Sequence, residues 1–270
     1  AIELSINDDK VEVFVCMRYW HPMSDAVTGA VKAFCPDEIV LLPLYPQFST
    51  TTVGSSLKDW HRSAAKAGLS VPTHAVCCYP TAQGWITAQA DLISQALTEK
   101  PSGVRILFSA HGLPRKVVDD GDPYQWQVEQ TAAAVVSALG GYDNWVVCYQ
   151  SRVGPLEWIG PSTEEELARA AEEGLGVIIV PIAFVSEHSE TLVELDIEYR
   201  ELAADLGLSS YVRVPAVGTH PAFIGGLAET VRKVRADIGS IPFGGAEGAR
   251  QCPSSFGKCP CSRAALQVTL

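Results

Sequence analysis

The sequence is short of basic residues. Lys and Arg total 20 against 31 Asp and Glu, so the formal net charge of the 270-residue chain is −11. Nucleic-acid binding depends on clustered Lys and Arg that neutralise phosphates, so this balance argues against a nucleic-acid partner. Disorder is excluded as well, because 47% of the residues are hydrophobic and only 19% are charged.

Long hydrophobic runs are also missing. The longest, residues 174–185, has about a dozen residues, whereas a membrane-spanning helix needs roughly 18 or more. We therefore expect no spanning segment, while contact with a membrane surface stays open. The sequence starts at Ala1 with no signal-peptide pattern, which we interpret as a processed or truncated start. The expected location is the cytoplasm, or the periphery of the inner membrane.

Short β-branched segments alternate with helical patterns along the chain, which predicts an α/β fold with parallel sheets built from βαβ units. The expected strands are 11–17, 38–44, 73–78, 104–109, 144–149, 177–180 and 211–214. The expected helices are 24–34, 54–67, 85–99, 124–139, 162–173, 186–206 and 221–238.

A faint internal repeat indicates how these units are grouped. The strands near residues 11, 39 and 74 return near 104, 145 and 177, about a hundred residues later. We expect two similar Rossmann-like domains at residues 1–100 and 101–240, the first without its opening strand. A Cys-rich tail is expected at residues 241–270.

Glycine-rich phosphate loops are absent from the predicted strand-to-helix turns, which argues against nucleotide chemistry. In open α/β sheets, ligands bind beyond the carboxyl ends of the strands. Here those ends carry Tyr, Trp, Phe, His and Arg, which suit a large flat aromatic ligand with carboxylates. His111 directly follows the strand 104–109. Its imidazole is suited to accept a proton or bind a metal, although it could also simply cap the strand end.

An acidic stripe runs along the predicted helix 186–206. Its carboxylates are spaced 3, 4, 4, 3 and 4 residues apart and would share one side of a regular helix. They are Glu187, Glu190, Glu194, Glu198, Glu201 and Asp205. The stripe is either a solvated acidic face or a path for a divalent cation inward and protons outward. His188 points about 100° away from Glu187 on an ideal helix, so their convergence needs irregular geometry such as a π-bulge.

Three cysteines gather near the C-terminus with the spacing Cys-x6-Cys-x-Cys: Cys252, Cys259 and Cys261. A disulfide would leave one thiol over, so a thiolate metal site fits better. Zinc and a [2Fe–2S] cluster both take four cysteines. We expect the fourth ligand to be Cys78 or its neighbour Cys77, with Cys78 as the candidate. Only one of them should serve, because successive side chains of a strand point to opposite faces.

Two long segments resemble the ferrochelatase family. They are LFSAHGLP at residues 107–114 and PIAFVSEHSETLVELDIEY at residues 181–199. Shorter likenesses lie at residues 17–22 and 150–158. The resemblance implies two Rossmann-like domains around a porphyrin cleft, and insertion of Fe(II) into protoporphyrin IX to give protohaem.

The resemblance also implies roles for individual residues. His111, Glu190 and His188 would be catalytic, with His111 and Glu190 meeting the substrate iron. Glu187, Glu194 and Glu198 would form a metal or proton path. The residues expected to line the porphyrin pocket are Arg18, Tyr19, Ser151, Trp158 and Phe184. Some members carry a [2Fe–2S] cluster, for which the expected ligands are Cys78, Cys252, Cys259 and Cys261.

Two other functions stay open at this point. One is a chelatase for another metal or ring, such as cobalt with a sirohydrochlorin-type ring or iron with coproporphyrin III. The other is a two-lobed metal-binding protein without catalysis, which would have no need of the three C-terminal thiols. The sequence leaves the oligomeric state undetermined.

Overall fold

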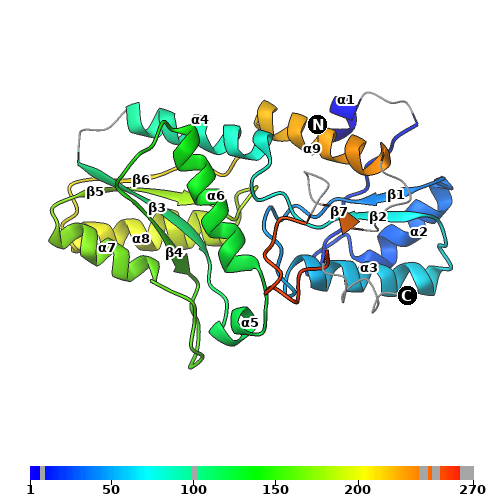
Figure 1. Cartoon of the computed structure of the whole chain (residues 1–270), viewed down its shortest axis with the longest axis horizontal. Helices are drawn as coiled ribbons and strands as arrows, with labels where there is room; N and C mark the ends of the chain where they lie inside the picture. Colours follow the sequence, from blue (N-terminus) through cyan, green and yellow to red (C-terminus); the bar gives the residue numbers. More distant parts are fainter. Residues whose placement is uncertain (7–9, 99–102, 237–242, 245–249, 262–270) are drawn as a thin grey trace.

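The computed structural model describes residues 1–6, 10–98, 103–236, 243–244 and 250–261, and these form two parallel sheets side by side (Figure 1). The larger sheet has the strand order β4-β3-β5-β6. Its strands are β3 (Val104–His111), β4 (Trp145–Gln150), β5 (Gly176–Pro181) and β6 (Tyr211–Arg213).

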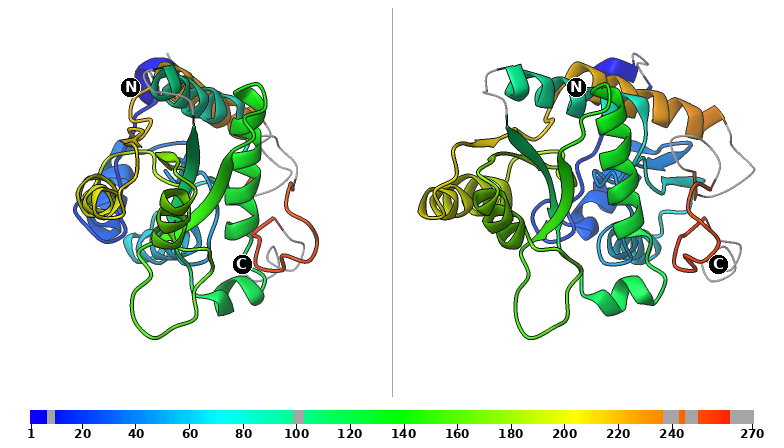
Figure 2. Two further views of the ribbon diagram at one scale, coloured as in Figure 1. Left: turned by 90° about the vertical axis from the view of Figure 1, so that its left-hand side faces the viewer. Right: turned by 60° about the vertical axis from the view of Figure 1, so that its left-hand side comes forward.

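Helices cover both faces of the larger sheet (Figures 1 and 2). On one face lie α4 (Gln83–Thr98) and α6 (Tyr124–Ala138); on the other lie α7 (Thr163–Glu172), the π-helix η1 (Glu190–Glu198) and α8 (Tyr199–Asp205). Successive side chains of β3 point to opposite faces of the sheet and pack into two different hydrophobic clusters. Ile106 and Phe108 pack in the cluster of α4 and α6, while Leu107 packs with Leu195 of η1. Being covered on both faces explains why this strand is almost wholly apolar.

The smaller sheet has the order β1-β2-β7, formed by β1 (Ile39–Leu41), β2 (Thr73–Val76) and β7 (Phe243–Gly244). Around it lie α1 (Ile2–Ile6), α2 (Ser24–Phe34), α3 (Val53–Ala67) and α9 (Pro221–Ala236). Helix α9 also packs closely on α4, because Gly84 and Gly226 face each other. A Cβ at Gly84 would collide with the carbonyl oxygen of Ala222.

The structure confirms the α/β class with parallel sheets, and it corrects one detail. The expected strand 11–17 does not form. Within the described residues it makes only an isolated bridge between Met17 and Met23, and its Val13 and Val15 side chains are exposed. Alternating apolar residues predicted a strand there, but none of the described strands pairs with it. Helix α9, which lies in the predicted second domain at residues 101–240, contacts β1 and β2 as well as α4.

The last described segment of the chain returns to the region between the two sheets. Residues 250–261, red in Figures 1 and 2, lie beside α6 and the short helix α5 (Arg115–Asp119). The Lys258 amide donates to the Gly121 carbonyl at 3.1 Å, and the rings of Trp126 and Phe256 are 5.9 Å apart. Among the helices described, none is both long and apolar enough to cross a membrane.

Candidate metal-insertion site and thiol cluster

The two strongest candidates from the sequence meet in the structure. His111 is the last residue of β3, and Glu190 is the first residue of η1, 79 positions further along the chain. Their side chains pair at 2.6 Å between Nδ1 of His111 and Oε2 of Glu190, and both remain partly exposed. Neighbouring parallel strands bring this about, because β3 and β5 run side by side and the chain turns from the end of β5 into η1.

This pairing shifts the pKa of both groups. The hydrogen bond to Glu190 raises the pKa of His111 against the opposing effect of burial, and the charges of Glu190 and Glu194 add to it. Burial raises the pKa of Glu190, but the hydrogen bond from His111 and the charges of His111 and His188 outweigh it and lower that pKa overall. An imidazole held ready to bind a proton thus faces a carboxylate held ionised.

His188 fixes the start of η1. Its backbone amide donates to Oγ1 of Thr191 at 2.9 Å, and its Nδ1 accepts from the Glu190 amide at 3.2 Å. The Phe184 ring lies 4.7 Å from the His188 ring, centroid to centroid. The predicted helix over 186–206 therefore begins four residues late, at Glu190. It opens as a π-helix, with the amide of Tyr199 bonded to the carbonyl of Glu194.

Glu194 is held firmly by β4 and α8. The Ser151 amide donates to its Oε1 at 2.7 Å, the Ser151 hydroxyl makes a short hydrogen bond to its Oε2, and the Tyr199 hydroxyl lies 3.1 Å from Oε1. Ser151 has a positive φ of 58°, which turns its amide and hydroxyl towards the same carboxylate. Glu198, the next glutamate along the predicted path, lies on the exposed side of η1.

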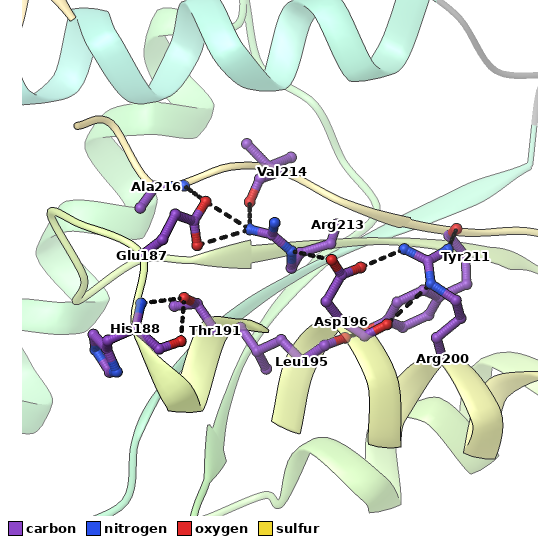
Figure 3. A network of polar contacts seen from close by, with 10 residues as sticks. All are labelled: Glu187, His188, Thr191, Leu195, Asp196, Arg200, Tyr211, Arg213, Val214 and Ala216. Atoms are coloured by element: carbon purple, nitrogen blue, oxygen red, sulfur yellow. Dashed lines mark hydrogen bonds and ion pairs between the residues drawn. The ribbon is translucent and has the colours of Figure 1, made fainter. Parts of the chain in front are cut away.

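Glu187 was expected on the metal or proton path, and the structure places its carboxylate in a different network (Figure 3). Nη1 of Arg213 donates to its two oxygens at 2.9 and 3.1 Å, and the Ala216 amide donates to Oε1 at 2.9 Å. These contacts tie the loop before η1 to β6, and a place for Glu187 on the metal or proton path stays a prediction.

The same arginine also holds the middle of η1. Nε of Arg213 lies 3.5 Å from Oδ2 of Asp196, and Nη2 of Arg200 donates to Oδ1 of Asp196 at 2.6 Å (Figure 3). The Tyr211 hydroxyl donates to the carbonyl of Leu195, whose side chain is fully buried. Sequence reasoning missed Arg213 and Asp196, and the one available signal was the apolar strand ending in an arginine.

Aromatic residues of the smaller lobe lie near the His111–Glu190 pair. Burial raises the pKa of Tyr45, and the nearby Tyr19 and Glu190 raise it further, which places Tyr45 within electrostatic reach of the pair. Tyr19 is 70% exposed, and the Arg18 guanidinium lies 4.6 Å from the centre of its ring. Nε of Arg18 donates to Ser55 at 3.0 Å. The sequence placed Tyr45 at a strand end, but no motif singled it out.

Trp158 lies beside β3, where residue 158 forms an antiparallel bridge with Pro114. Its Nε1 is buried without a hydrogen-bond acceptor in the described structure. Gly112 packs against it so closely that an added Cβ would come 3.3 Å from its ring. Trp158 is expected to line the porphyrin pocket, and its side chain packs against the turn that follows His111.

A second group of reactive side chains is the thiol cluster, defined as Cys77, Cys252, Cys259 and Cys261. The sulfurs of Cys77, Cys259 and Cys261 all lie within 4.8 Å of one another, and Cys252 hydrogen-bonds to Cys259. Hydrogen bonds from these neighbouring thiols lower the pKa of Cys259.

Cys78, the expected fourth member of this set, instead contacts Gln127 at 3.4 Å. Both cysteines follow the end of β2, and Cys77 is the one whose sulfur lies with those of Cys259 and Cys261.

These features define the class of the fold. Two parallel α/β sheets side by side are also the architecture of a solved chelatase structure. The solved structure "SirB from Bacillus subtilis with Fe3+" superposes with a TM-score of 0.63 over 87% of each chain, at 15% identity. At that identity the likeness shows the fold alone.

The sequence comparisons define the family. The ferrochelatase family model matches residues 1–235. The ferrochelatase of Caulobacter vibrioides is 52% identical over 269 residues, 98% of this chain and 76% of that one. The ferrochelatase of Pelagibacter ubique is 45% identical over 266 residues, 97% of this chain and 76% of that one. The chain belongs to the ferrochelatase family.

Proposed function

We propose that this protein inserts Fe(II) into protoporphyrin IX, giving protohaem and two protons, as a step of haem biosynthesis. The observation that carries the proposal is the 2.6 Å contact between His111 and Glu190 at the end of β3. Insertion replaces two pyrrole N–H protons by one divalent cation, so the site needs a proton acceptor close to a group that attracts the metal. This pair supplies both.

His111 is the proposed acceptor of the pyrrole protons. Its pKa is raised by the hydrogen bond to Glu190, so the imidazolium that forms is stabilised where it forms. Glu190 remains ionised, since its own pKa is lowered, and it draws Fe(II) towards the ring. His188 supports Glu190 by fixing the backbone at the start of η1.

Protons and iron need a route between this pair and solvent. The hydroxyl of Ser151 hydrogen-bonds to Glu194, and Ser151 is also within hydrogen-bonding reach of Glu190. Glu198 follows one turn further on, on the exposed side of η1. We propose that Glu190, Glu194 and Glu198 carry protons outward, with Glu194 as a fixed intermediate rather than a mobile carrier, because several donors hold it.

The porphyrin is proposed to lie against the aromatic residues around the pair. Tyr19 and Tyr45 approach from the smaller lobe, and Phe184 and Trp158 from the larger. Rings stack on a flat macrocycle, and Arg18 supplies a cation for a propionate. Because protoporphyrin is apolar, we expect the protein to act in the cytoplasm with peripheral contact to a membrane surface, where this substrate is more concentrated.

The thiol cluster fits a [2Fe–2S] cluster. Its sulfurs converge, and Cys77, Cys252 and Cys259 are buried, which suits a cluster held by four cysteines. When bound, such a group supplies one-electron chemistry and a cross-link between α6, β2 and the end of the chain. Among the described contacts of its cysteines none reaches His111 or Glu190, so we assign it to stability or sensing rather than to insertion.

An anaerobic assay tests the proposed function. Fe(II) is mixed with protoporphyrin IX, coproporphyrin III or a sirohydrochlorin-type ring, and the loss of free-base absorption is followed with and without protein. We expect the fastest insertion with protoporphyrin IX. Faster insertion into coproporphyrin III, or of cobalt into the sirohydrochlorin-type ring, would replace the proposed substrate. Tight metal uptake with no insertion into any ring would make the protein a binding protein.

A further inference from the structure

A single buried amide, that of Gln127 on α6, contacts both the thiol region and the smaller lobe. Its side chain is fully buried. Its Oε1 accepts a hydrogen bond from the Phe48 amide at 2.7 Å, and its Nε2 donates to Cys252 at 3.1 Å and to Cys78 at 3.4 Å. Because a backbone N–H can only donate, the Phe48 contact fixes which end of the amide faces the sulfurs.

On the sulfur side, the two N–H groups face a site built for negative charge. Cys252 is hydrogen-bonded to Cys259, which joins Cys77 and Cys261. N–H groups aimed at thiolate sulfurs stabilise the charged ligands and tune the metal that they hold. Gln127 thus contacts this charge from the side of α6, while the ligands come from β2 and the C-terminal segment.

On the other side, Gln127 holds a turn that reaches the porphyrin region. Phe48 belongs to the turn 45–49, which contains Tyr45, the residue electrostatically coupled to Glu190. The next residue back, Gln47, donates to the carbonyl of Ile182 at 3.2 Å. Ile182 lies two residues before Phe184, so this turn connects the thiol cluster with the wall of the proposed porphyrin site.

We propose that Gln127 couples the thiol cluster to the porphyrin site, its Nε2 donating to the Cys252 sulfur of the metal-loaded cluster and its Oε1 holding the turn 45–49. This rests on the proposed metal centre at the thiol cluster. Loss of the metal weakens one of the two contacts that hold the amide in place, and the turn that carries Tyr45 is then held less firmly. Nothing in the insertion chemistry itself requires this residue.

Two variants separate the two ends of the amide. Gln127→Glu keeps the length and the acceptor for the Phe48 amide but replaces the N–H donors by a carboxylate oxygen. Gln127→Leu removes both contacts. Gln125→Leu is the matched control, because Gln125 lies on the same helix and, among the described residues, its amide bonds to the exposed Glu129 and to no cysteine.

The variants are purified with their bound metal. Visible absorption gives the cluster content, a redox titration gives its reduction potential, and a chelator gives the rate of iron loss. We expect Gln127→Glu to lower the potential, since N–H donors favour the more negative reduced state, and to lose iron about tenfold faster. Protoporphyrin IX affinity should stay near that of the wild type in this variant.

The coupling itself is measured by comparing protoporphyrin IX binding with and without the metal, in the wild type and in the variants. Removing the metal should weaken protoporphyrin IX binding to the wild-type protein several-fold, while in Gln127→Leu binding should already be weak and unaffected by the chelator. Gln125→Leu should behave as wild type. If Gln127→Leu fails to fold, as judged by circular dichroism, the reduction potential of the cluster in Gln127→Glu becomes the deciding measurement for the role of Gln127.

Two results would overturn the proposal, and they differ. If the purified wild-type protein holds no metal at the thiol cluster, the proposed metal centre and this coupling are both refuted, and the proposed iron insertion still stands. If the wild type holds the metal but the Gln127 variants behave like Gln125→Leu, only the role of Gln127 is refuted.

Discussion

Replacing Arg213 by Met should destabilise the larger lobe, because this guanidinium is the link between β6 and two carboxylates near η1. Its side chain is only 12% exposed, and it pairs with Glu187 and Asp196, which are 32% and 33% exposed. An exposed pair contributes at most about 1 kcal/mol, and breaking a fully buried one costs about 3–5 kcal/mol. Because the ion pairs of Arg213 are partly buried, we expect their loss to cost an amount between these limits, about 2 kcal/mol.

The cost should depend on pH with a definite sign. Burial raises the pKa of Glu187, but hydrogen bonds from Thr191, Arg213 and Ala216 lower it overall, and the pKa of Asp196 is lowered mainly by Arg200 and then by Arg213. Carboxyls with a lowered pKa stabilise the fold above their ordinary values, 4.5 and 3.8 here, and lose that contribution as the pH falls through the folded-state pKa. The difference in unfolding free energy between the wild type and the Arg213→Met variant should therefore be largest at neutral pH and become smaller in acid.

Thermal unfolding between pH 3 and pH 8 measures this. A loss of about 2 kcal/mol corresponds to a fall of about 4–8 °C in the unfolding midpoint for a chain of this size. Arg232→Met is the matched control, since Arg232 and its partner Glu229 are both exposed, and its midpoint should move by less than about 1 °C. Equal midpoints for the two variants at pH 7, or a gap that grows in acid, would refute the reasoning.

Two further predictions concern η1. Glu190→Gln removes the main interaction that raises the pKa of His111, so that pKa should fall and the acid limb of the activity profile should move to lower pH, which NMR titration of the imidazole checks; an unchanged titration would contradict the pairing. Leu195→Ala should cost about 3 kcal/mol, because Leu195 is fully buried, whereas Leu192→Ala at a 45% exposed position on the same helix should cost less than about 0.5 kcal/mol. Urea unfolding measures the loss in each variant, and equal midpoints for Leu195→Ala and Leu192→Ala would contradict the stabilising role of the buried Leu195 side chain.

Periodicity in the sequence predicted the strands of the larger sheet well, because they are covered on both faces and nearly continuous in apolar residues. Strand β3 is expected at 104–109 and observed at Val104–His111. The same signal failed at residues 11–17. Alternation shows only that a segment can pair, and pairing depends on a neighbouring strand that local sequence does not specify.

The candidate site was predicted unevenly for a similar reason. His111 and Glu190 were found because both lie where strands end and both belong to long motifs. Glu187 was grouped with them by helical spacing, yet the chain is not helical there and the distant Arg213 binds its carboxylate. Ion pairs between residues far apart in sequence leave no local pattern.

The thiol cluster shows the limit of strand alternation. Alternation predicted that only one of Cys77 and Cys78 faces the tail, with Cys78 as the candidate, whereas it is the Cys77 sulfur that lies with those of Cys259 and Cys261. That choice depends on how the end of β2 turns towards α6, where Gln127 occupies the side that Cys78 faces. Only the packed structure contains this information.

Anaerobic Fe(II) insertion into protoporphyrin IX by His111→Ala tests the central claim most directly, with His61→Ala, an exposed histidine on α3, as the control. Loss of the proton acceptor should slow insertion at least about 100-fold while porphyrin binding persists, and the control should keep the wild-type rate. A His111→Ala protein that forms protohaem at the wild-type rate would contradict the account.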